Sequence, residues 1–175
     1  MTHTEAFEYM KQDFELHLDD SKLFRSLKKA RKVVEGNEAE QYAKLWDYAH
    51  EILRSNPGST VKIDSQAVSD TETQFQKIYI CLDACKRGFK AGCRPLIGLD
   101  GCFLKGYYGG QLLSAVAQDA NNHIFVVAYA VVHVENKDNW MWFLELLHAD
   151  LGDYKQHGWT FISDMQKVSN IDGCI

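Results

Sequence analysis

The spacing of hydrophobic and polar positions along this 175-residue chain changes near residue 58. Before that point, apolar residues recur every three or four positions, which is typical of amphipathic helices. One such run lies between Asp20 and Gly36, where Asp20 or Ser21 can cap a helix and the glycine can end it. A second run starts at Asn37 and stops before the Pro57 turn. The sequence therefore predicts a helical region over residues 1–58.

Two aromatic residues of the second helical run allow two interpretations. Tyr42 and Trp46 fall on its repeating apolar face, and aromatic side chains in such positions are usually buried. We therefore expect them in the core rather than on a surface where nucleic-acid bases stack. Residues 1–20 are acidic and only weakly periodic, so we expect an incomplete leading element there.

Residues 59–93 are predicted to form a connecting segment. Residues 59–70 alternate weakly between apolar and polar and then turn polar. Residues 75–82 have the composition of a strand, and residues 83–90 that of a short helix ending near Gly92.

From residue 94 the pattern predicts three antiparallel strands, a helix and a fourth strand. Asp138 or Asn139 is the expected cap of that helix, which is apolar over much of its surface and should pack on a sheet. A crossover helix favours a fourth strand parallel to the first. The predicted fold is α+β, an incomplete ribonuclease H-like mixed sheet over residues 94–175, preceded by the helical region. The strands expected are residues 96–99, 112–117, 124–134 and 159–163.

Two aspartates each end an apolar run, and they are the main candidates for chemistry. Asp100 follows the first predicted strand and Asp164 follows the fourth. If those strands are neighbours, the two carboxylates lie at one level of the sheet, where they repel each other unless a cation neutralises them. Oxygen ligands of this kind suit Mg²⁺, which also bridges phosphates. The alternative is that each is a strand-end aspartate that caps a turn.

Charge is distributed unevenly along the chain. The net charge of −5 argues against a protein that coats nucleic acid along its whole length. Residues 21–34 nevertheless contain several cations and no acid, which indicates either a solvated amphipathic helix or a contact with phosphates. These cations are Lys22, Arg25, Lys28, Lys29, Arg31 and Lys32.

The sequence has no apolar run long enough for a transmembrane helix, and its acidic first residues differ from a secretory signal. We expect a protein that is not secreted, with the cytoplasm or nucleus as its compartment. The irregular cysteine spacing favours free, mostly buried thiols over a zinc site. These cysteines are Cys81, Cys85, Cys93, Cys102 and Cys174.

Three other kinds of residue have structural interpretations. The histidines at 123, 133 and 148 are read as turn, strand and helix residues, because none has a ligand partner at a suitable spacing. Glu135 ends the third predicted strand, near the candidate site, and is read as a solvated strand end. Lys105 is read as a surface lysine.

Several motifs together resemble those of the plant Mutator-like element transposases. Residues 98–106, Gly-Leu-Asp-Gly-Cys-Phe-Leu-Lys-Gly, are similar to the first acidic motif of that family. Residues 161–167, Phe-Ile-Ser-Asp-Met-Gln-Lys, are similar to the second, and Glu135-Asn136 followed by Trp-Met-Trp-Phe-Leu at 140–144 fits the pattern between them. The resemblance extends over about residues 18–167.

The resemblance implies a transposase of the DDE type, in which three carboxylates on a ribonuclease H-like core hold two Mg²⁺ or Mn²⁺ ions for DNA strand cleavage and transfer. By motif, Asp100 and Asp164 are the first and second metal ligands. The implied partners are DNA at transposon ends and further transposase subunits, with no membrane and no small-molecule substrate. The implied location is the nucleus.

The family's third carboxylate, a glutamate on a later helix, has no counterpart in this sequence, because few residues follow Asp164. We therefore expect a truncated, transposon-derived chain that is inactive alone. Three alternatives remain open: a domesticated remnant that binds DNA or a transposase, a nuclease that uses only the two aspartates, and a product that folds poorly.

Overall fold

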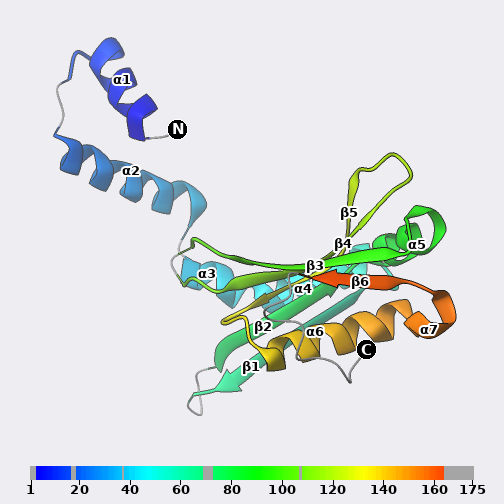
Figure 1. Cartoon of the computed structure of the whole chain (residues 1–175). Helices are drawn as coiled ribbons and strands as arrows, with labels where there is room; N and C mark the ends of the chain where they lie inside the picture. The colour runs from blue at the N-terminus through cyan, green and yellow to red at the C-terminus, as the bar shows by residue number, and fades with distance from the viewer. Residues whose placement is uncertain (1–2, 17–18, 37, 69–72, 107, 164–175) are drawn as a thin grey trace. The chain divides into compact units, whose positions relative to one another are not determined.

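The computed structural model describes residues 3–16, 19–36, 38–68, 73–106 and 108–163 (Figure 1). The chain forms two compact units, Met1–Leu45 and Trp46–Ile175. The expected connecting segment, residues 59–93, contributes two strands and a helix to the larger unit.

The smaller unit contains helices α1 (His3–Asp13), α2 (Asp20–Glu35) and α3 (Glu38–Ala43). Helix α1 is complete where an incomplete element was expected, and it packs on α2. The N-cap of α2 is Asp19, one position before the predicted cap. The predicted end at Gly36 is confirmed: this glycine has a φ of +84°, and its N–H donates to the Lys32 carbonyl at 3.1 Å.

The second helical run is two helices rather than one. Helix α3 ends at Ala43 and α4 (Leu45–Ser55) starts two residues later, with the Lys44 N–H bonded to the Gln41 carbonyl in a tight turn. The predicted burial of Tyr42 and Trp46 is wrong, because both are exposed and the buried residues of α4 are Ala49 and Ile52. Periodicity identified the face of the helix but not how far along it the core extends.

The larger unit is built on a six-stranded mixed sheet. The order is β1-β2-β5-β4-β3-β6, and every neighbouring pair is antiparallel except β3 and β6. The α+β class, the antiparallel three-strand segment and the parallel fourth strand are confirmed; the ribonuclease H-like assignment stays a prediction. The strands are β1 (Thr60–Ala67), β2 (Thr73–Cys81), β3 (Leu96–Phe103), β4 (Gln111–Gln118), β5 (Ile124–Val132) and β6 (Thr160–Ser163).

Helix α6 (Lys137–Leu151) runs along one face of this sheet (Figure 1). Alternate residues of the strands point toward it and form one buried core with its apolar side chains. Its cap is Asn136, whose side-chain oxygen accepts from the Asn139 N–H at 2.9 Å, so the cap predicted at Asp138 or Asn139 lies two to three positions too late. The remaining helices of the larger unit are α5 (Asp83–Gly92) and α7 (Tyr154–His157).

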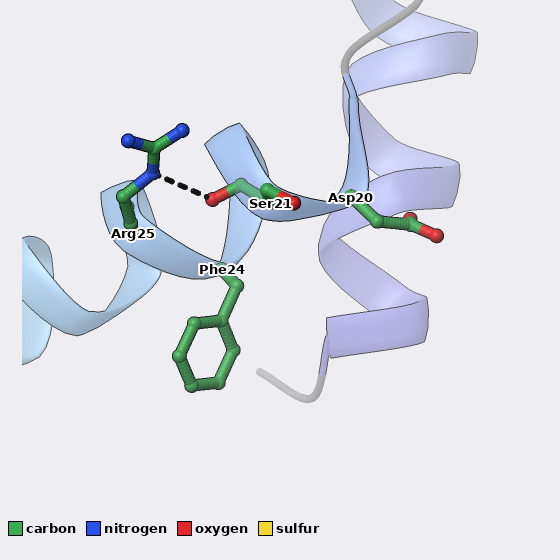
Figure 2. A pocket seen from close by; sticks show the side chains of 4 residues that line it. All are labelled: Asp20, Ser21, Phe24 and Arg25. Carbon is green, nitrogen blue, oxygen red and sulfur yellow. Dashed lines mark hydrogen bonds between the residues drawn. The ribbon is translucent and has the colours of Figure 1, made fainter.

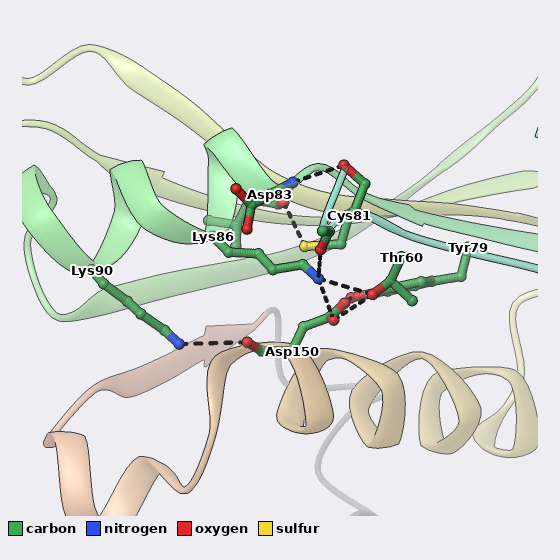
Figure 3. A network of polar contacts seen from close by, with 10 residues as sticks. Thr60, Tyr79, Cys81, Asp83, Lys86, Lys90 and Asp150 are labelled. Atoms are coloured by element: carbon green, nitrogen blue, oxygen red, sulfur yellow. Dashed lines mark hydrogen bonds and ion pairs between the residues drawn. The ribbon is translucent and has the colours of Figure 1, made fainter. Parts of the chain in front are cut away.

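A buried polar network ties α6 to elements that precede β3 in the chain (Figure 3). The Asp150 carboxylate pairs with the Lys86 ammonium at 2.7 Å and accepts hydrogen bonds from the hydroxyls of Thr60 at 2.6 Å and Tyr79 at 2.8 Å. Lys86 also donates to the Thr60 hydroxyl oxygen and to the Gly58 carbonyl. Every charged atom of this pair is therefore compensated, although the side chains of Lys86 and Asp150 are only 12% and 8% exposed.

The Asp150→Asn variant is expected to lose stability, because it leaves the Lys86 ammonium buried without a counter-charge. The free energy of unfolding, measured by urea denaturation, should fall by about 3 kcal/mol. The double variant that adds Lys86→Met removes both charges, so its loss should be smaller than the sum of the two single losses. The Lys90→Met control should change stability little, since that exposed ammonium reaches only the Asp150 carbonyl. Additive losses would contradict the pairing.

Candidate metal centre on β3

Strand β3 divides its side chains between the core and an exposed face. Ile97 and Leu99 are buried and belong to the core beneath α6. Leu96, Asp100 and Cys102 are exposed, and because successive side chains of a strand alternate, they share the opposite face. The first candidate metal ligand therefore lies on the side of the sheet that α6 does not cover.

The conformation of Asp100 is held by two local hydrogen bonds. Its carboxylate oxygen Oδ1 accepts from the Gly101 N–H at 2.8 Å. Its backbone carbonyl accepts from the Ser114 hydroxyl, on β4, at 3.2 Å. Within the described part of the chain no lysine, arginine or histidine forms an ion pair with this carboxylate. A solvated carboxylate oriented in this way is an oxygen donor of the type that Mg²⁺ and Mn²⁺ accept.

The parallel pairing of β3 and β6 leads, in the sequence, to the second candidate. The register runs from Leu96 opposite Thr160 to Leu99 opposite Ser163. In the sequence, the residues that follow this last pair are Asp100 and Asp164. Asp164 itself lies outside the described residues. Among the residues that the structure does describe, no group of three or more histidine, cysteine, aspartate or glutamate side chains could hold a metal ion.

Glu135 was read from the sequence as a solvated strand end, but it is half-buried. Its carboxyl group lies against the backbone of Gly101, on the side of β3 opposite Asp100. Its Oε1 atom accepts from the indole N–H of the buried Trp140 at 3.1 Å. In the sequence, the glycine at position 101 was the one feature that could have indicated this contact.

The cysteines occupy different environments. Cys81 is buried on β2, where burial and then the negative charge of Asp150 raise the pKa of its thiol to about 12. Burial also raises the pKa values of Cys85 and Cys93. Cys102 is a free, exposed thiol two residues beyond Asp100.

The three histidines that the sequence analysis interpreted lie in different settings. The His123 ring lies 3.2 Å from the Asp119 carboxylate within the β4–β5 turn. The backbone carbonyl of His148 accepts the N–H of Gly152 at the end of α6. The strand position predicted for His133 is wrong, because β5 ends at Val132 and His133 lies in the bend that follows. Its side chain helps to line a polar hollow beside β1 and β2.

The basic residues predicted to contact DNA lie on α2, in the smaller unit. Lys22, Arg25, Lys29 and Lys32 recur at intervals of three and four, so they follow one side of the helix, and all are exposed. Lys28 is also exposed, whereas the side chain of Arg31 is outside what the structure describes.

An open hollow lies at the start of α2, lined by Asp20, Ser21, Phe24 and Arg25 (Figure 2). Within it, the Arg25 Nε atom donates to the Ser21 carbonyl at 3.1 Å. The guanidinium of Arg25 is therefore held close to the helix, and the side chain of Phe24 is largely exposed.

One protein family matches part of the chain. Residues 96–170 match the family model of the MULE transposase domain, a segment that begins with β3 and includes both candidate aspartates. This match covers less than half of the chain; residues 96–170 are similar to a MULE transposase domain, which supports a transposon-derived, transposase-like protein. Searches of curated proteins and of solved structures gave no significant match. No helix in the described part of the chain is long and apolar enough to cross a membrane.

The exposed face of β3 can be probed through its cysteine. In the native protein at pH 8, iodoacetamide should modify Cys102 at least about a hundredfold faster than Cys81, because only the thiolate reacts and Cys81 is both buried and largely protonated. Peptide mass spectrometry after timed quenching measures both rates. The Cys102→Ser variant should lose the fast modification at this peptide, and similar rates at the two cysteines would contradict the assignment of faces.

Proposed function

We propose that this chain supplies part of the catalytic centre of a metal-dependent DNA transposase, with Asp100 and Asp164 as two of its metal ligands. The observation that supports the proposal best is the parallel register of β3 and β6, whose last described pair immediately precedes these two aspartates in sequence. The exposure of Asp100 and the match to the MULE transposase domain support it further.

The residues of the chain have separable tasks in this proposal. Asp100 is directed by the Gly101 N–H, which occupies one carboxylate oxygen and leaves the other open to a ligand. The Ser114 hydroxyl and the β4 ladder hold the backbone behind it. When bound, Mg²⁺ or Mn²⁺ neutralises phosphate charge and activates an oxygen nucleophile. In this proposal the natural ligand is a DNA phosphodiester, and the proposed compartment is the nucleus.

We further propose that these residues do not cleave or join DNA alone. The resemblance assigns two of the three carboxylates that a two-metal centre of this type uses. A site with two carboxylates binds divalent ions more weakly, because it supplies less negative charge and fewer oxygen ligands. The expected state is a weak metal site rather than an efficient nuclease.

Calorimetric titration with Mn²⁺ tests the proposal directly. The parent chain should bind Mn²⁺, and both Asp100→Asn and Asp164→Asn should weaken binding by tenfold or more, because each removes a charged ligand. Asp47→Asn, at an exposed position of α4, is the matched control and should bind like the parent. A folded parent that binds no Mn²⁺, or aspartate variants that bind normally, would refute the metal site.

A second candidate function is DNA binding without chemistry, through α2. The observation that favours it is the row of exposed cations from Lys22 to Lys32, which extends for about 15 Å along one side of the helix. Phosphates along a DNA strand are spaced closely enough for several to meet this row, and each neutralised phosphate releases counterions. Such binding would be independent of sequence and strongly dependent on salt.

Salt dependence of duplex DNA affinity separates this candidate from an inert fragment. Replacing Lys22, Lys29 and Lys32 by glutamine should reduce the slope of log K against log salt by about 3, at roughly 0.9 per lost phosphate contact. A charge-matched control replaces Lys44, Lys62 and Lys137, which are exposed elsewhere in the chain. Equal changes in the two triple variants would show that net charge, and not α2, controls binding.

A further inference from the structure

We infer that Glu135 is a positioning residue that fixes the backbone carrying Asp100, an inference that rests on the function proposed above. It occupies the α6 side of β3, directly behind the segment whose exposed side carries Asp100. It therefore acts through the strand and does not touch the ligand.

The contact between Glu135 and β3 depends on Gly101. A Cβ atom at position 101 would lie 2.9 Å from both the carboxyl carbon and Oε1 of Glu135, and 3.1 Å from its Oε2. Ordinary carbon contacts are longer than this, so only glycine allows the carboxyl group to rest against the strand. The same Gly101 donates its N–H to Asp100 Oδ1, so the residue that Glu135 supports also orients the candidate ligand.

Glu135 is itself held in place by α6. Its Oε1 accepts the indole N–H of Trp140, a residue only 1% exposed that stacks edge-on against the buried Phe143. The adjacent Asn136 caps the helix, and the Asn139 side chain donates to the Val134 carbonyl at 2.7 Å. The carboxyl group is thus anchored to a rigid corner between β5 and α6.

This support concerns the second half of β3. The described pairing with β6 runs from Leu96 to Leu99, and the described pairing of Asp100 to Phe103 is with β4. Within the part of the chain that the structure describes, the position of Asp100 therefore depends on one ladder and on the Glu135 corner behind it. Removing the Glu135 carboxyl group should therefore make Asp100 to Phe103 more mobile and leave the centre of the sheet unchanged.

Two measurements on the full chain test the inference. In Glu135→Ala, the amides of residues 101–103 should exchange hydrogen faster than in the parent, while the central amides of β4 and β5 keep their rates. In the same variant, Mn²⁺ affinity should fall by about tenfold or more. Glu135→Gln keeps the length of the side chain and an acceptor for Trp140, so it should restore both properties to within about threefold of the parent. Glu145→Ala, at an exposed position of α6, is the control and should change neither.

The outcomes distinguish the inference from the metal site. If the parent binds no Mn²⁺ but residues 101–103 alone exchange faster in Glu135→Ala, the metal site fails and the support of β3 stands. Unchanged exchange, or faster exchange throughout the sheet, overturns the inference, because the first shows no support and the second a general structural role. Unchanged Mn²⁺ affinity with faster local exchange also overturns it. If Glu135→Ala does not fold, Glu135→Asp, shorter by one methylene, should show both effects to a smaller degree.

Discussion

The parallel pairing of β3 with β6 is the constraint on which the candidate site depends. It joins two segments that lie more than 50 residues apart in the sequence and places Leu96–Leu99 beside Thr160–Ser163. Because α6 covers one face of β3, the alternation of side chains leaves Asp100 on the other. A carboxylate there stays hydrated, which avoids the cost of burying a charge and keeps it available to a ligand.

The structure also shows that the matched segment is not an independent folding unit. The MULE transposase match begins at β3, but α6 is held by Lys86, Thr60 and Tyr79, all of which precede the match. Asp150 is the one carboxylate they share. Strands β1 and β2 extend the sheet beyond β5, so the core under α6 is completed by residues outside the segment that the family model recognises.

Local signals predicted most of the elements correctly. The three antiparallel strands, the crossover helix and the parallel fourth strand follow from β-branched runs, turn residues and an apolar helix, all of which are properties of nearby residues. One error was local: Asn136 is the cap of α6 because its side-chain oxygen reaches the Asn139 N–H, three residues on. The other errors occur where burial depends on distant residues. Trp46 has the right periodicity but lies beyond the reach of the core. Glu135 appeared solvated because nothing near it in sequence shows that it packs on Gly101.

By itself the sequence determined the class of fold, Asp100 as the candidate ligand, and the resemblance to Mutator-like transposases. These conclusions depend on the types of neighbouring residues and their spacing, which a chain carries before it folds. The predicted end of the first strand at Leu99 was too early, because pairing with β4 continues the strand through Asp100 to Phe103. Only the tertiary structure decided which face of the sheet carries Asp100, that Asp150 gathers Lys86, Thr60 and Tyr79, and that Glu135 supports β3. Each of these contacts joins residues that are far apart in the sequence, so no local pattern reveals it. The packing of helix on sheet, and not local propensity, brings them together.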